Sequence, residues 1–126
     1  MKRQRRPVNL NLTTLQFPIT AITSILHRLS GIINLIIVGI ILRMLDISLS
    51  SPAGFLQFQV WIKNIFFKVI MWKLLTILFY HIIAGVRHIL MDFGIIDDNY
   101  QAGIFSAQVV FIFTILISII TGLIIW

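Results

Sequence analysis

Three apolar stretches, each long enough to cross a lipid bilayer, limit what this chain can fold into. They cover residues 18–45, 62–91 and 100–126, and a spanning helix needs about 20 mostly apolar residues. The first is uncharged from Leu29 to Leu42, and the third carries no charge. Transmembrane β-strands would instead appear as segments of about ten residues with alternating polarity. The sequence therefore predicts an all-α integral membrane protein with three transmembrane helices.

The low number of charged side chains supports this fold class. Only 11% of the 126 residues are charged and 59% are hydrophobic, whereas a soluble domain carries roughly 25% charged residues. A water-soluble globular fold is therefore excluded. The chain contains no cysteine, which excludes a disulfide scaffold, thiolate-held metals and a cysteine nucleophile.

The basic residues indicate how the chain crosses the membrane. Lys2, Arg3, Arg5 and Arg6 supply four of the ten basic residues behind the net charge of +6, and none follows the third stretch. Positive flanks stay on the cytoplasmic side, so we expect a cytoplasmic N-terminus. Residues 1–17 would form a basic cytoplasmic segment, and residues 18–126 a single three-helix transmembrane domain. This clustering indicates topology rather than nucleic-acid binding.

Two connections are expected between the helices. The segment Asp46–Gly54 is rich in serine, proline and glycine, which favours a turn. The segment Asp92–Gln101 contains Gly94, and its residues Asp97–Asn99 can cap the third helix.

Polar residues recur at helical spacing inside the apolar stretches, where a charge costs at least about 2.5 kcal/mol. Steps of three and four place such residues on one face of a helix. Arg28 borders the face of the first helix. A similar stripe in the third helix is interpreted as close packing, and three lysines as interfacial. The polar face of the first helix consists of Thr20, Ser24, His27, Gly31 and Asn34, and that of the second consists of His81, Gly85, His88 and Asp92. The packing stripe of the third helix consists of Ser106, Thr114, Ser118 and Thr121. The interfacial lysines are Lys63, Lys68 and Lys73.

The histidines are expected to converge on one side of the membrane. At 1.5 Å per residue, His27 lies about 13 Å past Pro18, and His81 about 16 Å before Asp92. Neutral imidazole at this depth is a suitable axial ligand for haem iron. His81 and His88 are about 10 Å apart along one helix, so a six-coordinate haem would need its second histidine from another chain. Arg28, His88 and Arg87 are at a depth suited to haem propionates.

Two motifs carry a family resemblance. The stretch S-I-L-H-R-L-S-G (Ser24–Gly31) and the later H-x3-G-V-R-H-x3-D (His81–Asp92), after an opening Arg6-Pro7-Val8-Asn9-Leu10, resemble the cytochrome b membrane-anchor subunit of succinate dehydrogenase. The similarity is strongest to the larger anchor subunit of the bacterial four-subunit enzyme. Many relatives have Ser-Pro-His where this chain has Val8-Asn9-Leu10, so no role is transferred to those positions.

The resemblance implies a function in the bacterial inner membrane. The family passes electrons from succinate, through a flavoprotein and an iron–sulfur subunit, to ubiquinone. It implies that His81 is an axial ligand of haem b shared with a smaller anchor subunit, and that His27 lies near the propionates. It also assigns Ser24 and Arg28 to the quinone pocket. The chain alone would then have no site for succinate.

The chemistry of a quinone suits these two residues. Its carbonyl oxygens accept hydrogen bonds, and it gains negative charge before it gains protons. Ser24 offers a hydroxyl, and Arg28 offers a fixed positive charge one turn later.

Three other functions remain open at this point. The His27, His81 and His88 row could relay protons or ions. The polar faces could serve only to hold helices together in a structural anchor. A fumarate reductase anchor would share the same architecture.

Overall fold

The computed structural model describes residues 17–97 and 99–126, and all regular elements in these residues are helices. They are α1 (Ile19–Ser50), α2 (Pro52–Lys63), α3 (Ile65–Asp92) and α4 (Tyr100–Ile125). Helices α1, α3 and α4 are long and apolar enough to cross a membrane. The prediction of an all-α fold with three membrane-spanning helices is therefore confirmed. The expected basic segment, residues 1–17, lies outside the described residues except for Phe17.

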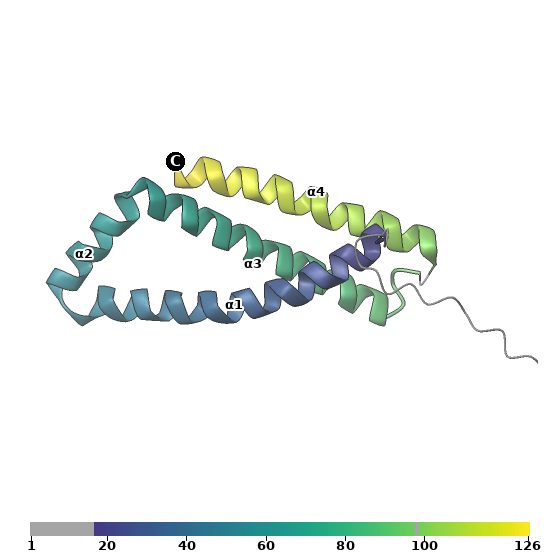
Figure 1. Ribbon diagram of the computed structural model, residues 1–126, viewed down its shortest axis with the longest axis horizontal. Coiled ribbons are helices and arrows are strands. Elements are labelled where there is room, and N and C mark those ends of the chain that lie inside the picture. The colour runs from purple at the N-terminus through teal and green to yellow at the C-terminus, as the bar shows by residue number, and fades with distance from the viewer. Residues whose placement is uncertain (1–16, 98) are drawn as a thin grey trace, which may run out of the picture.

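Figure 1 shows how the helices are arranged. Helix α4 runs antiparallel beside α3, and α1 crosses this pair near its own N-terminal half. Further along, α1 diverges from α3, and α2 bridges the gap between them (Figure 1). The start of α1 and the α3–α4 connection lie at one end of the molecule, and α2 and the C-terminus lie at the other (Figure 1). The early residues of α1 and the late residues of α3 therefore share one end.

The first connection differs from the expected turn. Helix α1 continues through residues 46–50, and a further helix, α2, follows after Ser51 alone. The Ser51 side chain accepts a hydrogen bond from the Gly54 backbone N–H at 3.0 Å, and Pro52 occupies the first position of α2. Serine as an N-cap followed by proline favours a helix start. The same residue types that suggested a turn thus begin a helix.

The next two helix starts are also capped by side chains. The Asn64 side chain accepts from the Phe66 N–H at 2.9 Å. Helix α3 therefore begins at Ile65, shortly after the expected start at about residue 62. The Asn99 side chain accepts from the Ala102 N–H at 2.7 Å, which confirms capping by the residues before α4. Gly94 has a φ of 68°, a left-handed conformation that glycine adopts readily after a helix.

Small residues pack α4 against its neighbours. The stripe in the third spanning helix is confirmed as a packing face because Ser106 and Thr114 are buried. The Ser118 hydroxyl lies 2.8 Å from that of Thr76. Close approach of helices through small residues is the common mode of packing in membranes. The buried residues of α4 are Gly103, Ser106, Ala107, Val110 and Thr114.

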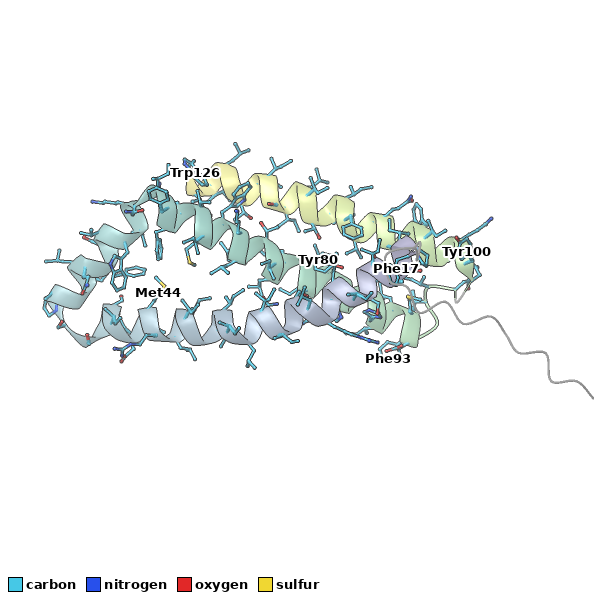
Figure 2. The ribbon with its side chains drawn as sticks, viewed as in Figure 1. Phe17, Met44, Tyr80, Phe93, Tyr100 and Trp126 are labelled. Carbon is cyan, nitrogen blue, oxygen red and sulfur yellow. The ribbon has the colours of Figure 1, made fainter. Side chains whose placement is uncertain are left out.

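Two further polar contacts join the helices. Tyr80 lies where α1, α3 and α4 approach one another (Figure 2), and its hydroxyl donates to the Thr23 carbonyl at 2.9 Å. Near the other end, the Lys68 ammonium donates to the Ile125 carbonyl at 3.1 Å, where a cation suits the C-terminus of α4. The remaining lysines of the interfacial set, Lys63 and Lys73, are exposed.

Most large apolar side chains point away from this interior. Leu35 is 77% exposed and Leu123 is 78% exposed. Such surfaces are unfavourable in water but are compatible with lipid tails or with helices of partner subunits. The chain is therefore a multi-pass membrane protein.

We predict that the end holding the start of α1 faces the cytoplasm, because the Lys2–Arg6 cluster precedes that helix. A reporter enzyme that is active only in the cytoplasm should work when fused before Met1 and fail when fused after Trp126. The opposite pattern would reverse the topology.

Candidate haem and quinone site

The three histidines of the chain come together where α1 crosses α3. The rings of His27 and His81 stack with centroids 4.4 Å apart and planes inclined by 14°. The ring of His88 lies 5.0 Å from that of His27, inclined by 41°. The expected convergence of the two polar faces is therefore observed. The described residues contain no group of three histidine, cysteine or carboxylate side chains that could hold a bare metal ion.

A glycine of the opposite helix faces each of the two stacked histidine rings. A Cβ atom added to Gly31 of α1 would lie 3.2 Å from Cε1 of His81. One added to Gly85 of α3 would lie 3.4 Å from Nε2 of His27. Each imidazole thus covers a glycine of the opposite helix. Gly31 leaves room that a Cβ would crowd, whereas a Cβ at Gly85 would be in ordinary van der Waals contact.

The contacts of His81 determine which of its nitrogens carries the proton. Its Nδ1 lies 2.9 Å from the Ser30 hydroxyl and 3.2 Å from the His27 carbonyl oxygen. A carbonyl oxygen can only accept, so a neutral His81 ring donates from Nδ1 and keeps its lone pair on Nε2. Histidines that bind metals usually donate their other ring N–H in this way. The arrangement fits a single nitrogen ligand to a haem iron.

Ser30 is the residue of this site that sequence reasoning missed. It lies inside the S-I-L-H-R-L-S-G motif, three residues after His27 and therefore on the same side of α1. That spacing was the available signal.

Some buried polar atoms at this crossing have no partner among the described residues. They are Nε2 of His27 and both side-chain polar atoms of Asn34. An unpaired polar group is costly to bury, and these atoms are enclosed by the chain itself.

Ser24 and His88 line a cavity at the end of the molecule where α1 begins. It has a volume of about 430 Å³, and its walls are Thr20, Ala21, Ser24, Arg87, His88, Met91 and Asp92. Within the described residues no hydrogen bond involves the Ser24 hydroxyl, whereas the neighbouring Thr23 hydroxyl donates to its own helix at Ile19. The Ser24 hydroxyl is therefore available to a ligand.

The structure separates the two arginines of this region. Arg28 is exposed on α1 and does not line the cavity. Arg87 is buried, and its guanidinium donates to the Ser106 hydroxyl at 2.9 Å and to the Gly103 carbonyl at 3.3 Å. Depth alone placed Arg87 among the candidates for propionates; its two hydrogen bonds join α3 to α4, and its side chain also lines the cavity.

Comparison with known proteins identifies the family. Residues 2–121 match the family described as the succinate dehydrogenase/fumarate reductase transmembrane subunit. The succinate dehydrogenase cytochrome b556 subunit of Coxiella burnetii is 33% identical over 97% of this chain and 98% of its own. The cytochrome b560 subunit of Reclinomonas americana is 34% identical over 91% of this chain and 85% of its own. The cytochrome b556 subunit of Paracoccus denitrificans is 32% identical over 75% and 72%. This chain thus belongs to the family of succinate dehydrogenase cytochrome b membrane-anchor subunits.

Proposed function

We propose that this chain is the larger membrane anchor of a succinate dehydrogenase, and that it binds haem b and forms part of the ubiquinone site. The observation that carries the proposal is the hydrogen-bonded state of His81, whose Nδ1 faces an oxygen acceptor while Nε2 makes no hydrogen bond to any of the residues that the structure describes. The family membership supports it, because the three relatives are named as cytochrome b556 and b560 subunits of succinate dehydrogenase.

In this proposal His81 binds the haem iron, while His27 and His88 lie beside the propionates. Haem b, when bound, supplies a one-electron carrier. His27 stacks on His81 and so lies beside the proposed iron ligand. His88 lies next to His27 and lines the polar cavity. One iron ligand comes from this chain, so the other comes from the smaller anchor subunit.

The quinone site is proposed around Ser24 and Arg28. The Ser24 hydroxyl faces the cavity and can donate to a quinone carbonyl. Arg28 lies one helical turn further along α1 and is exposed on this chain, so its charge is open to a ligand or a partner subunit. We therefore propose that the iron–sulfur subunit and the smaller anchor complete the pocket. The iron–sulfur subunit would deliver to it the electrons of succinate oxidised in the flavoprotein.

The proton-relay alternative gains no support from the geometry. A relay needs hydrogen bonds that connect its members, but His27 and His81 stack face to face. Within the part of the chain that the structure describes, no hydrogen bond joins the ring nitrogens of two histidines. A purely structural anchor would not need His81 to keep Nε2 free. The names of the relatives also favour succinate oxidation over fumarate reduction.

We predict that stable haem binding requires the smaller anchor subunit, because in the proposed site this chain offers only one of the two iron ligands. The four-subunit complex should give a reduced-minus-oxidised b-type spectrum and a full equivalent of haem in a pyridine-haem assay. The same chain expressed without the smaller anchor should be unstable and contain little haem. A stable six-coordinate haem in the isolated chain would contradict the shared site, and a complete complex without a b-type spectrum would overturn the proposed function.

A further inference from the structure

Ser30 lies buried beneath His81 and contacts two polar groups at once. The side chain is only 4% exposed. Its hydroxyl donates to the His27 carbonyl at 2.7 Å and lies 2.9 Å from Nδ1 of His81. A hydroxyl has one hydrogen and two lone pairs. Once the hydrogen is given to the carbonyl, only a lone pair is left to face His81, so Ser30 accepts the Nδ1–H of the ring.

The opposite tautomer of His81 is unfavourable in this arrangement. If Nδ1 carried no hydrogen, Ser30 would have to turn its hydrogen away from the His27 carbonyl. The Nδ1 lone pair would then face the carbonyl oxygen at 3.2 Å with no hydrogen between them. Two lone pairs in a buried site would repel, and a hydrogen bond would be lost. Ser30 and the His27 carbonyl therefore select the same tautomer.

Of the two oxygen atoms that face Nδ1 of His81, the Ser30 hydroxyl is closer than the His27 carbonyl. The next residue, Gly31, has no Cβ to push Cε1 of His81 away. Without the Ser30 hydroxyl, Nδ1–H would keep only the longer contact to the carbonyl. The ring would lose both its shortest hydrogen bond and part of its fixed orientation.

We propose that Ser30 is a positioning residue that holds His81 in the Nδ1–H tautomer and thereby lowers the reduction potential of the haem. The inference rests on the proposed function, because it assumes that His81 binds the haem iron through Nε2. Donation from Nδ1 to an oxygen acceptor makes the ligand more basic at Nε2. A more basic ligand stabilises the oxidised iron more than the reduced iron, and hydrogen bonding around a ligand is one of the means by which proteins set haem potentials.

The test uses the assembled four-subunit complex with Ser30→Ala, and measures the haem midpoint potential by redox titration. We expect the potential to rise, because the oxidised haem is stabilised less in the variant. A change of about tenfold in the equilibrium constant between oxidised and reduced haem corresponds to about 59 mV for one electron. Ser30→Thr keeps the hydroxyl and should titrate close to the wild type. Thr23→Val is the matched control, since the Thr23 hydroxyl is buried on the same helix and, among the described residues, bonds only the backbone of its own helix at Ile19. It should leave the potential unchanged.

A second variant guards against failed assembly. Ser30→Cys keeps the shape of the side chain, with a slightly larger atom, but offers a weaker acceptor, so it should shift the potential in the same direction by a smaller amount. If His81→Leu loses the haem while both Ser30→Ala and Ser30→Cys titrate at the wild-type potential, the role of Ser30 is wrong and the proposed function stands. If His81→Leu keeps a six-coordinate haem, the assignment of His81 itself is wrong. A potential that falls in Ser30→Ala would also overturn the inference.

Discussion

Replacing His81 by leucine should remove the haem or change its spectrum to that of a site lacking one ligand. The leucine side chain is apolar and has no lone pair, so the iron would keep only the ligand from the partner subunit. Loss of groups that merely support a ligand already lowers metal affinity by about 10- to 100-fold. We therefore expect the haem content of the purified complex to fall by more than about tenfold, as measured by a pyridine-haem assay.

The control for this prediction is His88→Ala. His88 lies next to His27 rather than over Gly31, and it lines the polar cavity. Because we propose that it lies near the propionates and does not bind the iron, its removal should leave a six-coordinate spectrum and near-normal haem content. Swapped effects of the two substitutions would show that His88 is the ligand.

Ser24→Ala and Arg28→Leu should each sharply lower the rate of succinate:quinone reduction in the assembled complex. Each would leave a quinone oxygen without its partner, which costs about 1–3 kcal/mol, or about 5- to 150-fold in rate. Succinate oxidation with a water-soluble acceptor that takes electrons from the flavoprotein or iron–sulfur subunit should persist. The haem should remain bound in Ser24→Ala, since serine is not a ligand.

Two control variants sharpen the interpretation. Arg28→Lys keeps the charge but loses the planar guanidinium, so it should retain more activity than Arg28→Leu. Arg43→Leu removes an arginine from the same helix that pairs with Asp46 at 2.6 Å on the exposed surface, and it should have little effect. Full quinone activity in Ser24→Ala and Arg28→Leu would refute the quinone site, and equal loss of both activities would show that these residues act in assembly instead.

The pairing of His27 with His81 could be predicted because it depends on local properties of the sequence. The 3.6-residue period places His27, Gly31, His81 and Gly85 on facing stripes. Counting the rise from each helix end gives both histidines similar depths. The structure confirms the pairing with rings 4.4 Å apart.

The first connection could not be predicted in the same way. Serine, proline and glycine occur both in turns and at helix starts, so composition alone did not distinguish them. The structure distinguishes a turn from a helix start here. The Ser51 side chain accepts from the Gly54 N–H and so caps α2, which begins directly after α1.

The sequence by itself determined the three spans and the face of each helix that carries polar residues. The tertiary structure decided which polar groups on those faces meet. It joined Ser30 to His81, 51 residues away. It also brought Arg87, which lines the cavity, into a hydrogen bond with Ser106 on α4. Periodicity reports only the direction in which a side chain leaves its own helix. Hydrogen bonds between helices also depend on where and at what angle the helices cross, and here that crossing is set by small residues and by the packing of all three spans.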